Sequence, residues 1–208
     1  MKAKLFLIFL LLLSASQINA QILKNYGLKG AVSSSFQQID PFYKDMPYKR
    51  YVGFNAGIFT EWFNHPFLSL VAQIEYRQVG MREPFVFSDA TGTVLRTEYY
   101  DSRFDYATVP LFIKICRNAF VSSYLFMGPR IDVLLGYKTE DAYTTTLFDK
   151  YDKTVIGGSF GFGFEINMTS RLKTYLEFRY NHDFTDTYND GFLKITNNAF
   201  DLWAGVGF

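Results

Sequence analysis

Apolar and polar residues alternate strictly between residues 171 and 181. The apolar parity holds Leu172, Thr174, Leu176, Phe178 and Tyr180, and the other holds Lys173, Tyr175, Glu177, Arg179 and Asn181. A period of two is typical of a pleated strand, whose successive side chains point to opposite faces. The segment is therefore predicted to be a β-strand with one apolar face and one charged face.

Seven further segments with the same period are bounded by polar, turn-rich residues. The eight predicted strands span residues 24–34, 51–61, 67–81, 98–116, 119–137, 153–166, 171–181 and 196–208. Long and short connections alternate between them, which is typical of an up-and-down antiparallel sheet. Pro110 lies within the fourth segment and cannot donate to a ladder, so a β-bulge is expected there.

The polar parity of these strands carries both signs of charge in equal number. It holds Lys29, Glu61, Glu75, Arg77, Lys114, Arg130, Asp132, Glu165, Lys173, Glu177, Arg179 and Asp201, six basic and six acidic residues. Buried charges are tolerated when they are paired, and an eight-stranded barrel is just wide enough for side chains to fill it. We expect a packed ionic interior in preference to a conducting pore.

Composition favours a membrane as the surroundings of the apolar parity. Aromatic residues make up 19% of the chain, and large amphipathic aromatics favour membrane–water interfaces. Beyond the N-terminal segment, no run approaches the 18 apolar residues of a spanning helix. The prediction is an all-β, eight-stranded, antiparallel up-and-down transmembrane β-barrel in contact with lipid of the cell outer membrane. A soluble exported barrel of lipocalin type, with the apolar parity inside, is the alternative.

Residues 1–20 have the features of a cleaved signal peptide. Lys2 and Lys4 precede an apolar run at residues 5–13, and Ala20 ends a plausible cleavage site. The apolar run is too short to span a bilayer as a helix. We expect a signal peptide at 1–20 and a barrel domain at 21–208.

Charge and cysteine content exclude several kinds of function. The 21 basic and 20 acidic residues nearly balance, which gives no electrostatic reason to expect nucleic acid as a partner. One cysteine, Cys116, and two histidines provide neither a disulfide framework nor a Cys/His zinc site. No cofactor is predicted.

The sequence contains no motif that reports a catalytic activity. His182, beside Asp183, is the one candidate general base for a lipid A-modifying enzyme, but no serine stands at a recognisable spacing. A non-enzymatic envelope scaffold or interaction protein is therefore the favoured interpretation, with the enzyme as an alternative. Aromatic residues in the long connections are candidates for partner contacts or for an interfacial girdle, namely Phe42, Tyr43, Tyr99, Tyr100, Tyr143, Phe148 and Tyr188.

Two adjoining segments match a known family, YATVPLFIK at residues 106–114 and YLFMGP at residues 124–129. They resemble the PorT-like outer-membrane beta-barrel proteins, in which the first segment reads YLEIPLLLK. The resemblance implies a small eight-stranded barrel of the Gram-negative envelope and, as partners, envelope or secretion-complex proteins. Thr108 replaces the usual glutamate of that family, and the family has no common catalytic residues to carry over.

Overall fold

The fold is described from a computed structural model of the protein. The structure describes residues 23–40, 49–63, 65, 67–117, 119–139, 151–169, 172–189 and 193–208. The predicted signal peptide, residues 1–20, lies outside them. The strands are β1 (Leu23–Asp40), β2 (Lys49–Trp62), β3 (Leu68–Ser88), β4 (Val94–Cys116), β5 (Val121–Thr139), β6 (Thr154–Asn167), β7 (Lys173–Asp183), β8 (Tyr188–Asn189) and β9 (Lys194–Gly207).

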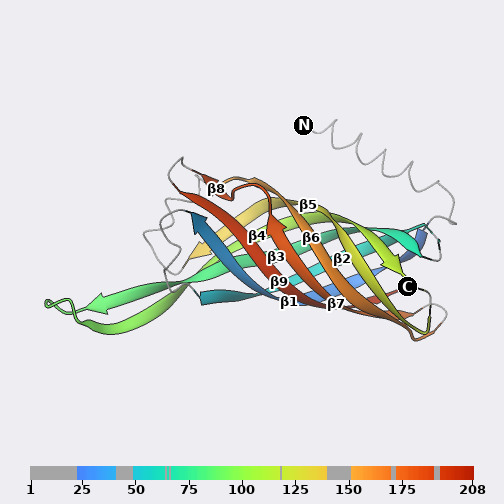
Figure 1. Ribbon diagram of the computed structural model, residues 1–208, viewed down its shortest axis with the longest axis horizontal. Helices are drawn as coiled ribbons and strands as arrows, with labels where there is room; N and C mark the ends of the chain where they lie inside the picture. The colour runs from blue at the N-terminus through green and yellow to red at the C-terminus, as the bar shows by residue number, and fades with distance from the viewer. Residues whose placement is uncertain are drawn as a thin grey trace.

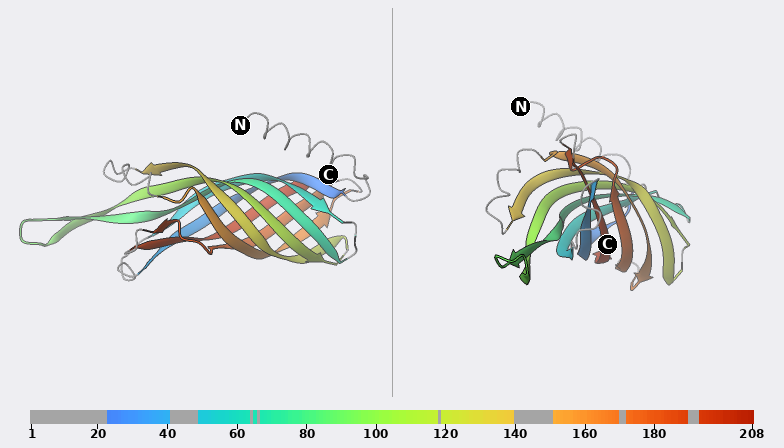
Figure 2. Two further views of the ribbon diagram at one scale, coloured as in Figure 1. Left: turned by 90° about the horizontal axis from the view of Figure 1, so that it is seen from above. Right: turned by 60° about the vertical axis from the view of Figure 1, so that its left-hand side comes forward.

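The strands form one antiparallel sheet that closes on itself (Figures 1 and 2). Each long strand pairs with the next in sequence, and β1 pairs with β9 from Gly27↔Gly207 to Asp40↔Lys194. The short β8 pairs with β9 beyond the end of β7. The predicted all-β, up-and-down barrel of eight long strands is thus confirmed. Within the described ranges, no helix is both long enough and apolar enough to cross a bilayer.

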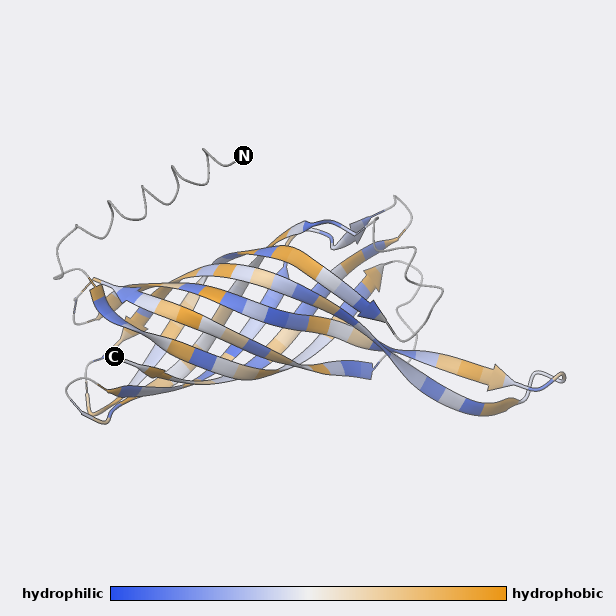
Figure 3. Cartoon of the chain, turned by 180° about the vertical axis from the view of Figure 1, so that it is seen from behind, coloured by the Kyte–Doolittle hydropathy of each residue, from blue (hydrophilic) through white to orange (hydrophobic). Residues whose placement is uncertain are grey.

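The two faces of the barrel wall differ in the way the alternation predicts, and hydropathy alternates along the strands in Figure 3. The apolar parity points outward, where Phe54, Ile74, Val109, Leu125 and Phe160 are each more than half exposed. Charged and aromatic side chains are buried inside. An apolar outer band around a polar interior is the reverse of a lipocalin, so the soluble-barrel alternative is wrong.

The two ends of the barrel differ in their connections. At one end, no more than five residues join β2 to β3, β4 to β5 and β6 to β7. Short turns are periplasmic in outer-membrane barrels, so we assign this end to the periplasm and the opposite end to the outside.

Several strand limits differ from the prediction. Residues 82–97, predicted as one long connection, are mostly strand, because β3 continues to Ser88 and β4 begins at Val94. The strand register stays unbroken through Pro110 on both sides, so the bulge expected there is wrong. The register shift between β4 and β5 lies instead at Asp105/Tyr106.

The extra length of β3 and β4 forms a projecting two-stranded hairpin, residues 83–101, here called the arm. The last pair between β2 and β3 is Lys49↔Arg82, and β5 ends at Ser102↔Thr139. Beyond these pairs, the two strands of the arm pair only with each other within the described part of the chain. The arm extends past the outer end along the long axis of the barrel (Figures 1 and 3).

Candidate functional site

Alternating lysine and glutamate side chains cross the periplasmic end of the interior. Lys114 Nζ lies 3.2 Å from Glu61 Oε2 and 2.7 Å from Glu165 Oε2. Lys24 reaches the other oxygen of Glu61 at 3.0 Å, and Lys173 reaches the other oxygen of Glu165 at 2.7 Å. These five residues, here the periplasmic cluster, connect side chains of five strands, and each carboxylate is shared by two ammonium groups.

Above this cluster, Arg179 is the centre of a second group. Its guanidinium lies 2.7 Å from Glu75 Oε1 and 3.5 Å from Glu177 Oε2, and donates to Gln73 Oε1 at 3.0 Å. Lys29 forms an ion pair with Glu177. Glu75, Glu177, Arg179 and Lys29, here the central cluster, carry two positive and two negative charges and are all buried. The group is therefore neutral as a whole.

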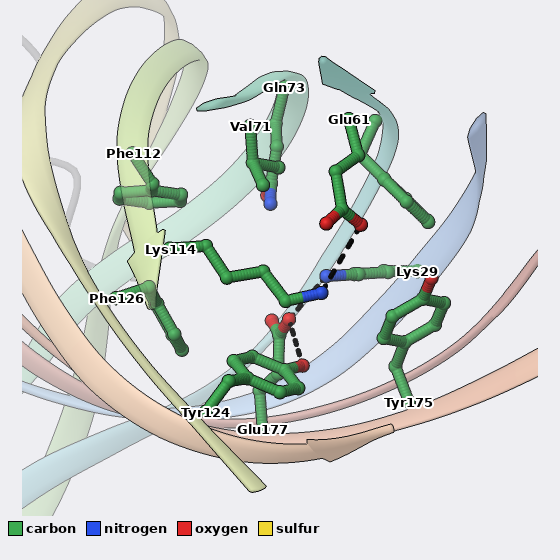
Figure 4. Close-up of a pocket in the computed structure, with 11 residues that line it drawn as sticks. Lys29, Glu61, Val71, Gln73, Phe112, Lys114, Tyr124, Phe126, Tyr175 and Glu177 are labelled. Atoms are coloured by element: carbon green, nitrogen blue, oxygen red, sulfur yellow. Dashed lines mark hydrogen bonds and ion pairs between the residues drawn. The ribbon is translucent and has the colours of Figure 1, made fainter. Parts of the chain in front are cut away.

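The close-up in Figure 4 shows the space between these two clusters, with Lys29, Lys114, Glu61 and Glu177 pointing toward one another from different strands. The open space among them is only about 10 Å³, which is room for about one water. Side chains therefore fill the interior at this level.

A third group, the outer cluster, joins Arg77, Arg130, Asp132 and Asp183. Asp132 Oδ2 lies 3.2 Å from Arg77 Nη1 and 3.0 Å from Arg130 Nε, and Arg130 also pairs with Asp183. Asp201, nearby in the interior, accepts a hydrogen bond from Asn181 at 2.7 Å. Arginine suits such shared sites because its planar donors can reach two carboxylates at once.

The structure buries eleven of the twelve charged residues that the polar parity singled out, while Lys173 is partly exposed. Two members of the clusters were missed. Lys24 has the outward parity, but a register shift at Leu23/Asn25 lets its side chain turn inward. Asp183 lies just beyond the predicted strand 171–181, although β7 continues to it and it shares the parity of Arg179.

Aromatic side chains close the outer end of the interior. Tyr151 packs against Phe104 and Tyr188 with ring centroids 4.8 and 5.3 Å apart, and Tyr137 lies 4.7 Å from Phe104. Tyr188 was expected in an outer loop or girdle, but it is buried here. Phe42, Tyr43, Tyr143 and Phe148 lie outside the described residues.

His182 does not form a catalytic pair with Asp183, because successive strand residues point to opposite faces. Its Nδ1 lies 2.6 Å from Asn198 Oδ1 and its ring stacks on Tyr180. An apolar groove of about 760 Å³ lies beside it on the lipid-facing wall. Ser159 is adjacent, but its hydroxyl donates to Asn181 inside the barrel at 2.6 Å. In the described part of the chain, neither Ser159 nor Asp183 is therefore placed to act together with His182.

The described residues contain no group of three or more histidine, cysteine or acidic side chains arranged to hold a metal ion. The buried Cys116 is a free thiol. The polar clusters of the interior are therefore built from ion pairs and hydrogen bonds.

The arm has a hydrogen-bonded tip and an aromatic face. At the tip, Asp89 Oδ1 accepts hydrogen bonds from the Thr91 hydroxyl at 2.6 Å and from the amides of Thr91 and Thr93, both at 2.9 Å. The Thr91 hydroxyl and these amides hold the pKa of the Asp89 carboxyl below its usual value. Along one face, Phe85 contacts Phe87 at 5.0 Å and Tyr100 at 5.7 Å between ring centroids. Tyr100 and its neighbour Tyr99 are therefore residues of the arm.

Comparison with known proteins supports the same architecture. The family model described as "Outer membrane protein beta-barrel domain" matches residues 15–189. No curated protein matches the chain.

Solved structures of outer-membrane proteins are also similar. OprG from Pseudomonas aeruginosa has a TM-score of 0.51 at 8% identity, over 90% of this chain and 96% of that chain. Neisserial surface protein A has a TM-score of 0.49 at 14% identity, over 88% and 95% of the two chains. The protease OmpT from Escherichia coli has a TM-score of 0.42 at 12% identity, over 91% and 97%. At these identities the likeness concerns the fold, and of these three structures OprG supports it.

Proposed function

Because this chain belongs to the outer membrane protein beta-barrel domain family, we propose that it is a non-enzymatic interaction protein of the cell outer membrane. The family and the outward apolar band place the barrel in that membrane. The barrel acts as an anchor, and the arm is the element that meets a partner.

The arm is the single observation that carries this proposal. It rises beyond the outer end and exposes large apolar side chains, with Phe85 50% and Leu95 67% exposed. Contiguous exposed apolar residues on a protein surface often mark an interaction site. The packed interior adds support, because among the described residues the space between the periplasmic and central clusters has room for about one water.

The resemblance to PorT-like proteins makes an accessory role in an envelope or secretion complex the specific form of this proposal. The similar segments, 106–114 and 124–129, lie in β4 and β5 of the barrel wall. Inward residues there include Lys114 of the periplasmic cluster. These segments support a shared scaffold, and the partner contacts are assigned to the arm.

Affinity purification from the native host tests the proposal. The tagged protein is extracted from outer membrane with detergent and compared with a variant in which residues 84–99 are replaced by an Asn-Gly turn, which keeps Glu83 opposite Tyr100. Co-purification of envelope proteins with the intact chain, and their loss from the armless variant, is the expected result. An equal set of partners on both proteins, or on an unrelated tagged barrel, would refute the role of the arm.

A further inference from the structure

We propose that the open edge of β4 in the arm binds an extended segment of a partner protein as an added β-strand. The inference rests on the proposed interaction function and specifies the chemistry of the partner. It follows from the direction of the backbone groups in β4, from Pro84 in β3, and from the side chains on the two faces of the arm.

The backbone of β4 offers unused hydrogen-bonding groups at its open edge. The Cys116 amide donates to the Phe67 carbonyl at 3.1 Å, so this pair of β3 and β4 residues is a hydrogen-bonded one. Hydrogen-bonded and non-hydrogen-bonded pairs alternate along an antiparallel ladder. The register between β3 and β4 is unbroken as far as Phe87↔Arg96. Odd-numbered residues of β4 therefore turn their amide and carbonyl groups away from β3.

In the barrel, those odd-numbered residues face β5, but β5 ends opposite Ser102. Thr97 and Tyr99 lie beyond that point within the regular register and have no strand partner at this edge among the described residues. Their N–H and C=O groups form a row that another strand can pair with. The open edge of β4 in the arm is thus the same edge that pairs with β5 within the barrel.

The opposite edge of the arm is protected. Pro84 is opposite Tyr99, and by the same alternation its nitrogen points away from β4, toward the open edge of β3. Proline has no N–H to donate, and proline on an edge strand is a common device against strand addition. Residues 94–99 of β4 contain no proline. The two edges therefore differ, and β4 is the one that can accept a strand.

Side chains on both faces define what the added strand would contact. On one face, Phe85 is half exposed, and Arg96 lies over the Phe87 ring at 4.5 Å while pairing with Glu98 at 3.2 Å. On the other face, Leu95 is strongly exposed. A partner segment with alternating apolar and polar residues would lay its apolar side chains on one of these faces and leave its polar side chains on the other.

The charge of the arm and the direction in which it extends further restrict the kind of partner. Residues 82–101 contain four acidic and two basic residues, which favours a neutral or basic segment. The arm extends along the barrel axis beyond the rest of the strands, as Figure 2 shows. A lipid surface cannot supply the regular backbone hydrogen bonds that this edge offers. An isolated two-stranded hairpin is only marginally stable in water, so an added strand would also stabilise the arm.

Two substitutions at one position test the inference. Thr97→Pro removes an N–H that faces the open edge and leaves the bonds between β3 and β4 intact, whereas Thr97→Ala keeps the N–H. The probe is a fluorescent, proline-free peptide of about eight residues with alternating valine and lysine or threonine. The readouts are fluorescence anisotropy with the full-length protein in detergent and hydrogen exchange of the arm amides.

The inference predicts saturable binding that Thr97→Pro weakens about tenfold or more and Thr97→Ala changes by less than about twofold. The peptide should slow exchange at the Thr97 and Tyr99 amides. Equal binding to both variants would overturn strand addition at this edge. Slow exchange at these amides in the protein alone would also overturn the inference. The same holds if protection increases with the concentration of the protein itself or with added lipid vesicles.

The result can be separated from failure of the proposed function. If the armless variant loses its partners while Thr97→Pro keeps them, the arm is an interaction element, and strand addition is wrong. If the armless variant keeps every partner, the proposed function itself fails.

Discussion

At the scale of single residues, the stability of the barrel depends on how its buried charges share partners. Each of Glu61, Glu165 and Asp132 lies between two cations. Arg179 is the converse case, a cation between two carboxylates. Removing one member of such a group leaves a buried charge without compensation, which costs far more than losing a pair on the surface.

Arg179→Met should therefore destabilise the protein by about 3–5 kcal/mol, because Glu75 and Glu177 lose their shared partner. Urea unfolding in detergent micelles or vesicles measures this difference. Arg96→Met is the matched control, since its pair with Glu98 is exposed and should contribute no more than about 1 kcal/mol. Similar losses in both variants would show that burial does not set the strength of these pairs.

The alternation in the sequence predicts which charged residues point into the barrel, because the side chains of a strand have a fixed period. It cannot reveal where the period breaks. Lys24 turns inward beside a register shift, which depends on how two distant strands meet. The partners of each charge were equally hidden, since Lys29 and Glu177 are 148 positions apart.

At the scale of elements, β6 shows how the interior accommodates large side chains. Its inward positions include Gly157, Gly161 and Gly163, and a Cβ at each would overlap neighbouring atoms. At Gly161, that atom would lie 2.2 Å from the Phe178 carbonyl oxygen and 2.7 Å from the Phe126 ring. The small residues of β6 thus leave room for bulky side chains from β5.

We expect Gly161→Ala to destabilise the barrel by about 1–3 kcal/mol, because neither the backbone carbonyl nor the packed ring can move freely. Gly136→Ala is the control, since nothing lies within 4 Å of a Cβ built there. The temperature at which the folded, faster-migrating gel form disappears compares the two variants. An unchanged temperature for Gly161→Ala would contradict the tight packing.

The arm is the element that the sequence did not reveal. The segment between residues 82 and 97 has the composition of a loop, with Pro84, Asp89, Gly92 and several charged residues. The tip does contain a turn, with Gly92 at a φ of 84°. The flanking strands were missed because outside the bilayer neither face must be uniformly apolar, so the period of two is weak. The alternation in β3 and β4 within the barrel, by contrast, is strong because lipid requires it.

At the scale of the whole molecule, side chains pack the interior of the barrel in its middle and at its outer end. Ion-pair clusters fill the middle, and Tyr137, Tyr151 and Tyr188 pack together at the outer end. Burial raises the pKa of the Tyr151 hydroxyl above its usual range. It remains neutral at physiological pH and adds no charge to this end.

Reconstituted into planar lipid bilayers, the protein should insert without steady ionic conductance, because the space between its interior clusters admits about one water. Single-channel recording tests this, with a porin as positive control. A reproducible open level that persists in the armless variant would show that the interior conducts.

The seam between β1 and β9 also governs when the molecule can form. The first strand meets its second neighbour only after the last strand has been made, and Lys29 of β1 is paired by Glu177 of β7, near the other end of the chain. Early strands therefore carry charges that nothing nearby in sequence can neutralise. Contacts between such distant residues make folding slow. We therefore expect the chain to reach the membrane unfolded, and the barrel to insert, close and pair its interior charges in one late, cooperative step.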